Sequence, residues 1–197
     1  MKKMNNIRTI VADDDSGAGM VTMQVIPGQS VIDWTAFKTA GQHNGSLLIK
    51  SGTVEVDPTD KHPIGGTIYF DMNSIDDFDQ TGAMKDLLIG DLKKADFFDV
   101  EKYPEAKLEI IKVDHMPDSS GNYGVNAALT MKGIRNEITF KANYQVQPDG
   151  SIKIQTGEII VDRIKWGITV GSKNIFKKLA DHIIADNFDV KATVVAK

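Results

Sequence analysis

The segment 134–147 has the cleanest alternation of apolar and polar side chains in the chain. One face carries Ile138, Phe140, Ala142, Tyr144 and Val146, and the other carries Thr139, Lys141, Asn143, Gln145 and Gln147. Successive side chains of a β-strand point to opposite faces, so this period predicts a strand with one dry and one wet face. Such a strand belongs to an antiparallel sheet that covers an apolar interior.

Other short extended runs, separated by turn residues, fill most of the remaining chain. The expected strands cover 21–25, 30–38, 47–49, 53–56, 64–72, 106–115, 123–131, 152–162 and 188–196. Asn44 and Gly45 predict a turn between two of them, because both residues tolerate a positive φ. About eight antiparallel strands must protect their edges by closing into a barrel or by forming a sandwich.

One helical insertion interrupts the strands. The main helix is expected over 79–94, with Leu87, Leu88 and Leu92 on one side as a docking face. The insertion is too long for a hairpin turn, so it must cross or cover an end of the sheet. Apolar residues at helical spacing predict a second short helix over 174–185.

An aromatic segment follows the main helix, with Phe97 and Phe98 between two aspartates. Two adjacent rings are costly to leave in water, so at least one should fill apolar space beneath the loop, at about 1.5 to 3 kcal/mol per buried side chain. Pro104 ends the segment, because the residue before a proline disfavours the helical region. We expect this segment to act as a lid.

The length of 197 residues suits one all-β domain. We expect a flexible N-terminal tail over 1–19 and one folded domain over 20–197. The expected fold is mainly β: a single antiparallel eight-stranded barrel with one main helix and a short second helix. A barrel of this size encloses either packed side chains or one small ligand.

Charge and composition exclude several classes of function. The net charge is −4, so the chain lacks the basic field that nucleic-acid binding needs. The absence of cysteine excludes disulfides, thiolate nucleophiles and cysteine-type metal sites. No apolar run approaches the length of a transmembrane helix.

Motifs for catalysis or metal binding are absent from the sequence. The four histidines are scattered, without the HExxH spacing of a zinc site. Asp57, Asp60 and His62 lie close together, where we expect a solvated loop rather than a cation site. The acidic run 71–82 lacks the glycine and the glutamate of a calcium loop. We therefore expect no catalytic residue, no metal and no cofactor.

The residues expected to face the interior combine small side chains with flexible ones. The small ones are Ala36, Ala128, Ala142 and Ala192, and the flexible ones are Met23, Met72 and Met131. Small residues leave room and methionines adapt to irregular apolar shapes. This pattern fits both a filled core and a ligand tunnel, and the residues alone favour the core.

The segment 162–167 holds the best polar candidate. Arg163 could bind a carboxylate or a lipid phosphate while Trp166 stacks on it or covers it. The alternative is a structural pair between an arginine and an aspartate that braces the loop. His43, beside the expected turn, lies either at a barrel mouth or on the surface.

The run 95–104, ADFFDVEKYP, closely resembles the signature of the YceI-like family of bacterial lipocalin-like barrels. Further stretches match in the family's order at 65–66, 71–75, 129–133, 138–140, 162–163 and 166–167. The resemblance covers roughly 25–195. It implies a lipocalin-like barrel that binds a long apolar chain, a polyisoprenoid lipid or an isoprenoid quinone, without covalent chemistry.

The resemblance implies that the inward residues bind the ligand. The apolar candidates are Trp34, Ala36, Phe70, Met72, Phe98, Met131, Phe140, Ala142, Trp166 and Ala192. His43 and Arg163 are the polar candidates at the mouth. The expected partner is a long-chain lipid rather than nucleic acid, and a homodimer is compatible with the sequence.

Two alternatives to a carrier stay open. One is an isomerase or hydrolase that acts on the bound chain, which needs a titratable group facing the cavity. The other is a stress or interaction protein with a packed barrel. The first residues lack the apolar core of a signal peptide, so a full chain is expected in the cytoplasm. The resemblance implies the periplasm if the start is a mature or replaced terminus.

Overall fold

The computed structural model describes residues 19–39, 41–175 and 183–197. Strands make up most of this part of the chain, as the alternation predicts. They are β1 Val21–Gln24, β2 Val31–Lys38, β3 Gly41–Val56, β4 Pro63–Asp77, β5 Glu105–Val113, β6 Tyr123–Met131, β7 Ile134–Val146, β8 Ile152–Thr156, β9 Ile159–Asp162 and β10 Ile184–Ala196. The helical elements are the α-helix α1 Gly82–Lys93 and two 3-10 helices, η1 Pro27–Gln29 and η2 Arg163–Trp166.

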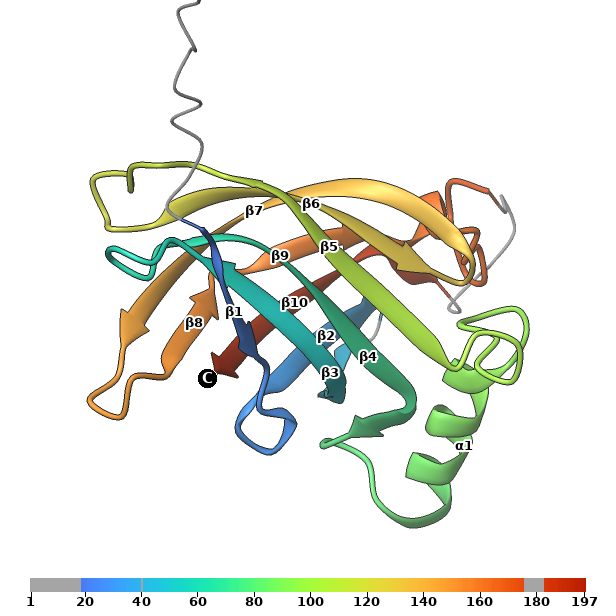
Figure 1. The fold of residues 1–197 in the computed structure, drawn as a ribbon. Coiled ribbons are helices and arrows are strands. Elements are labelled where there is room, and N and C mark those ends of the chain that lie inside the picture. The colour runs from blue at the N-terminus through green and yellow to red at the C-terminus, as the bar shows by residue number, and fades with distance from the viewer. Residues whose placement is uncertain (1–18, 40, 176–182) are drawn as a thin grey trace, which may run out of the picture.

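The strands form one antiparallel sheet that closes on itself (Figure 1). Around the barrel the order is β3, β2, β10, β8, β7, β6, β5 and β4, and β4 pairs with β3 again. β1 pairs with β3 on the same side as β2 but further along the strand, so β1 and β2 share one position in the barrel. β9 and β8 share another position in the same way, because both pair with the same side of β10. The described strands thus occupy eight positions, which confirms the predicted barrel.

Strand β7 shows how alternation creates the two faces of the wall. Ile138, Phe140 and Ala142 face the interior, while Thr139 and Lys141 are exposed on the outer surface. Every residue of β6 pairs with β7 in an uninterrupted register. Because the side-chain period of a strand is two, this register keeps the apolar set of both strands inside.

The predicted turn at Asn44 and Gly45 is wrong, because both residues lie inside β3. Gly45 pairs with Trp34 on β2 and with Asp77 on β4. A Cβ atom at Gly45 would collide with the carbonyl oxygen of Asp76. Close approach of backbone, rather than a turn, is therefore what requires glycine at this position.

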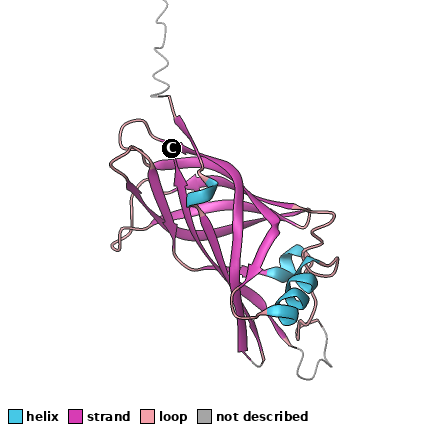
Figure 2. Ribbon diagram, turned by 90° about the horizontal axis from the view of Figure 1, so that it is seen from below, coloured by secondary structure: helices cyan, strands magenta, loops and turns pink. Residues whose placement is uncertain are grey.

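Helix α1 is shorter than predicted and docks less closely. It begins at Gly82 rather than Asp79, and it contains no buried residue. The predicted leucine face is wrong for Leu87, whose exposed fraction is 58%. Leu92, in the last turn, reaches the barrel interior. Figure 2 shows α1 outside the sheet, next to one end of the barrel, so the helix covers that end instead of packing along the wall.

The aromatic segment after α1 packs as predicted. Phe97 and Phe98 are both half-buried and contact the main core. The Phe98 N–H donates to the Leu92 carbonyl oxygen at 3.1 Å, which turns the chain back beneath the helix. Val100, two residues further on, is only 3% exposed and anchors the segment.

The predicted second helix falls mainly on residues 176–182, which lie outside the described residues. Of its two ends, 174–175 form a turn and 184–185 begin β10. Residues 1–18 of the predicted tail over 1–19 also lie outside the described residues. Within the described ranges, no helix has the length and hydropathy needed to span a membrane.

Candidate functional site

The barrel encloses a cavity of about 230 Å³, and its wall is made almost entirely of apolar atoms. All eight strand positions contribute to the wall. Nine of the ten predicted apolar residues line it: Trp34, Ala36, Phe70, Met72, Phe98, Met131, Phe140, Ala142 and Ala192. The cavity is therefore many times larger than the space that one water molecule needs.

The size of the inward side chains explains why space remains between the strands. Ala36, Ala142 and Ala192 come from β2, β7 and β10, and each presents only a methyl group to the interior. Rings such as Phe70 and Phe140 form the rest of the wall. A barrel of eight strands just holds its own side chains, so alanine at several inward positions leaves a void.

One end of the cavity lies under α1 and the aromatic segment. Leu92, Phe97 and Phe98 line it there, together with Met72 from β4. The Met72 N–H donates to the Pro104 carbonyl oxygen at 3.0 Å, which fixes the end of the aromatic segment to the barrel. The segment 95–104, which closely resembles the YceI-like signature, therefore forms part of the wall at this end.

The opposite end carries a cluster that the sequence did not predict. His62 is only 6% exposed, so the expectation of a solvated loop is wrong for this residue. Its ring lies 4.7 Å from the Tyr123 ring and 5.8 Å from the Tyr144 ring, and all three residues line the cavity. Burial raises the pKa of Tyr144 to about 12, with smaller effects from Tyr123 and Asp60. Tyr144 is therefore neutral at physiological pH.

Trp166 is the one apolar candidate that does not line the cavity. It is fully buried in the main core, and its Nε1–H donates to the Leu129 carbonyl oxygen at 3.1 Å. The local sequence sets this position. Asp162 caps η2 by accepting from the Ile164 N–H at 3.1 Å, and Gly167 ends the helix at a φ of 71°.

Arg163, predicted at the mouth, is 4% exposed and holds backbone segments together. Its guanidinium donates to the carbonyl oxygens of Ala185 at 2.9 Å, Ile168 at 2.7 Å and Ile184 at 3.1 Å. Burial lowers the pKa of Arg163, and the carboxylate of Asp186, 3.7 Å away, opposes that shift. These contacts match the alternative of a structural brace.

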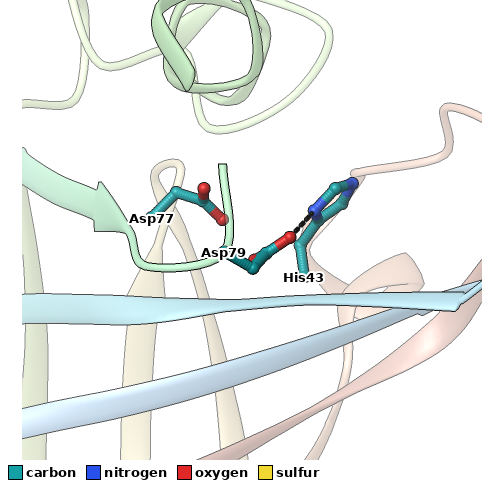
Figure 3. A group of neighbouring side chains, drawn as sticks. All are labelled: His43, Asp77 and Asp79. Atoms are coloured by element: carbon teal, nitrogen blue, oxygen red, sulfur yellow. Dashed lines mark hydrogen bonds and ion pairs between the residues drawn. The ribbon is translucent and has the colours of Figure 1, made fainter. Parts of the chain in front are cut away.

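His43, the other predicted mouth residue, lies outside the cavity. Its Nδ1 is 2.8 Å from Asp79 Oδ2 (Figure 3). Its Nε2 is 2.7 Å from Lys38 Nζ. The two polar candidates therefore bind different partners. Neither one offers a free charged group to the apolar cavity.

The described cavity wall contains no aspartate and no glutamate. Its titratable side chains are His62, Tyr123, Tyr144 and the engaged Arg163. The other side chains of the wall are mostly apolar, so the cavity offers burial to nonpolar groups.

Comparisons with known proteins agree with this geometry. The structure of BcnA from Burkholderia cenocepacia matches with a TM-score of 0.66 at 19% identity, covering 88% of this chain and 99% of that one. A polyisoprenoid binding domain from Saccharophagus degradans matches with a TM-score of 0.62 at 14% identity, covering 91% and 99%. A mutant YCEI protein of Campylobacter jejuni with a monobromobimane guest matches with a TM-score of 0.55 at 14% identity, covering 100% and 99%.

At these identities the solved structures show a common fold, and a search of curated proteins gave no match. The family comparison covers the whole barrel. A model described as the YceI-like domain matches residues 23–196, from the end of β1 to the end of β10. This chain therefore belongs to the YceI-like domain family.

Proposed function

We propose that the protein binds and carries a long apolar chain inside its barrel, without covalent chemistry. The ligand class that we propose is a polyisoprenoid lipid or an isoprenoid quinone. The observation that carries the proposal is the apolar cavity, which extends from the aromatic segment at one end of the barrel to His62 at the other. An apolar space that reaches both ends of the barrel suits a chain better than a compact polar molecule.

Removal of apolar surface from water supplies the affinity. Each buried methylene contributes about 0.8 kcal/mol, and the ordering of a flexible chain opposes part of this gain. Aromatic and methionine side chains such as Phe140 and Met131 can adapt to methyl branches along an isoprenoid. The polyisoprenoid binding named for the S. degradans domain supports the same ligand class.

The two alternatives receive less support. A packed barrel would leave no room for a chain, whereas this interior has a cavity of about 230 Å³. An enzyme would need a reactive group in the cavity, and the described wall carries no carboxylate. His62 is the one histidine in the wall, and it packs against two tyrosine rings.

Filling the cavity should weaken binding while the barrel stays folded. The variants Ala142→Phe and Ala192→Phe each place a ring where a methyl group now lines the cavity. We expect each variant to lower the affinity for a fluorescent long-chain lipid analogue at least tenfold. This equals about 1.4 kcal/mol, or about two buried methylenes. Fluorescence titration of delipidated protein measures the change.

Thr139→Phe is the matched control, because it adds the same ring to the exposed face of β7. It should bind the probe as tightly as the parent protein. Circular dichroism and the melting temperature must show that all three variants are folded. Folded Ala142→Phe and Ala192→Phe variants with the parent's affinity would contradict binding in the cavity.

A further inference from the structure

Three side chains with metal-ligand chemistry meet where β3 and the end of β4 pair (Figure 3), and none of them lines the cavity. His43 lies near the start of β3, Asp77 ends β4, and Asp79 follows in the loop that leads to α1. The pairing of β3 with β4 brings them together, since the Phe78 N–H donates to the Asn44 carbonyl oxygen at 2.8 Å. One nitrogen or oxygen atom from each residue lies within 4.8 Å of the other two.

Asp77 is the unusual member of this group, because it is a carboxylic acid with no exposed surface. Its Oδ2 accepts from the Gln80 N–H at 2.7 Å. Its Oδ1 is buried and has no hydrogen-bond partner among the described residues. A buried oxygen of this kind costs free energy unless a proton or a cation satisfies it. Burial, together with the neighbouring Asp79, raises the pKa of Asp77.

The other two side chains are held in place by different contacts. Asp79 Oδ1 accepts from the Asn44 N–H at 2.9 Å, and its Oδ2 accepts from Gln80 Nε2 at 3.0 Å and from His43 Nδ1 at 2.8 Å. Burial opposes ionisation of Asp79, but these hydrogen bonds outweigh it and lower the pKa of its carboxyl. One ionised carboxylate therefore lies beside a buried carboxyl group and an imidazole.

We propose that His43, Asp77 and Asp79 bind a divalent transition-metal cation, with Zn²⁺ the best match. One imidazole nitrogen and two carboxylate oxygens are ligands that Zn²⁺ accepts, and three protein ligands leave a position for water. His43 and Asp79 have side-chain exposed fractions of 18% and 26%, so a cation can enter from solvent. The Asp77 carboxylate supplies the third ligand, and its Oδ1 has no protein donor among the described residues.

Binding requires a defined rearrangement of protons. Lys38 Nζ has only hydrogens to give, so in the contact at 2.7 Å the His43 Nε2 accepts and the proton of the ring is on Nδ1. A cation on Nδ1 displaces that proton, and Nε2 then carries the hydrogen. The exposed Lys38 must turn away. Any proton on Asp77 is released as well, because metal ligands bind in the deprotonated form.

The position of the site gives the cation a structural effect. It would join β3, the end of β4 and the loop before α1. Two contacts already hold α1 to β4: Lys85 pairs with Asp76 at 2.7 Å, and Lys93 Nζ donates to the Asn73 carbonyl oxygen at 2.7 Å. A bound cation would add a third connection at the start of the helix.

The competing explanation is a proton shared between Asp77 and Asp79. Two neighbouring carboxyl groups can share one proton, which satisfies the buried oxygen without a metal. The variant Asp77→Asn separates the two cases, since an amide resembles a protonated carboxyl but is a poor zinc ligand. It should keep the metal-free melting temperature within a few degrees of the parent and lose the response to Zn²⁺.

Untagged full-length protein, stripped with a chelator, provides the test. Titration calorimetry should detect saturable binding of Zn²⁺, and Zn²⁺ at 100 times its Kd should raise the melting temperature by about 5 to 10 °C. We expect Asp77→Asn and His43→Gln each to lower the affinity for Zn²⁺ at least tenfold. His115→Gln, which removes an exposed histidine elsewhere, should leave both measurements unchanged.

Three results would contradict the proposed metal site. They are the absence of saturable binding, folded Asp77→Asn and His43→Gln variants that bind Zn²⁺ as the parent does, and loss of the response in His115→Gln. Should Asp77→Asn not fold, Asp79→Asn takes its place in the same comparison. The test involves no lipid, so its outcome is independent of the carrier function.

Discussion

Replacing Trp166 with alanine is expected to lower the free energy of unfolding by about 3 to 5 kcal/mol. The indole has no exposed surface, and it packs in the main core between η2 and the barrel wall. Alanine would leave a void that the rigid sheet cannot fill, and the Leu129 carbonyl oxygen would lose the Nε1–H donor. Urea unfolding followed by far-ultraviolet circular dichroism measures the loss without using tryptophan fluorescence.

Two further variants separate packing from hydrogen bonding at this position. Trp166→Phe keeps a ring and removes the N–H donor, so it should cost less than the alanine variant. Phe78→Ala is the exposed control, because its ring is 60% exposed and its loss should change stability by less than about 0.5 kcal/mol. An unchanged midpoint for Trp166→Ala would show that the indole is not part of the folded core.

Arg163→Ala is expected to lower the free energy of unfolding by a similar amount, about 3 to 5 kcal/mol, because it removes a buried charge from its partners. The buried guanidinium donates to three carbonyl oxygens and pairs with Asp186. Removing it leaves these acceptors buried without a donor. Arg163→Lys should not restore the parent stability, because one ammonium group cannot reach three acceptors in the geometry of a guanidinium.

The affinity of the folded fraction distinguishes this brace from a headgroup ligand. We expect Arg163→Ala to bind an apolar probe as the parent does once unfolded protein is discounted. Arg135→Ala removes an exposed arginine and is the matched control for net charge. An Arg163→Ala variant with the parent's melting temperature and a tenfold lower affinity for an anionic lipid would make Arg163 a ligand-binding residue.

The inward faces of the barrel could be predicted from the sequence because strands have a fixed period of two. Once 134–147 is recognised as a strand, Phe140 and Ala142 must share a face, and the cavity wall confirms it. The burial of the aromatic segment could also be predicted, because two adjacent rings need apolar surroundings. Whether the enclosed space is filled or open depends on the packing of all strands together, which no single strand reveals.

Residues in loops and at close contacts were harder to predict. Gly45 resembles a turn residue in sequence, but its role depends on the Asp76 backbone, which approaches only when β3 and β4 pair. His62 lies among polar residues and is nevertheless buried by tyrosines from β6 and β7. The group of His43, Asp77 and Asp79 likewise exists only through strand pairing, since its members are 34 or more positions apart between β3 and β4.

Affinity as a function of chain length tests the central claim most directly. Delipidated protein should bind a homologous series of isoprenoid or alkyl chains with an affinity that rises up to about fourfold per methylene. The rise should stop when the cavity is full, because further methylenes stay in water. Fluorescence displacement below the concentration at which each lipid forms micelles gives the profile. Binding that does not depend on chain length, or no binding by the folded delipidated protein, would contradict carriage inside the barrel.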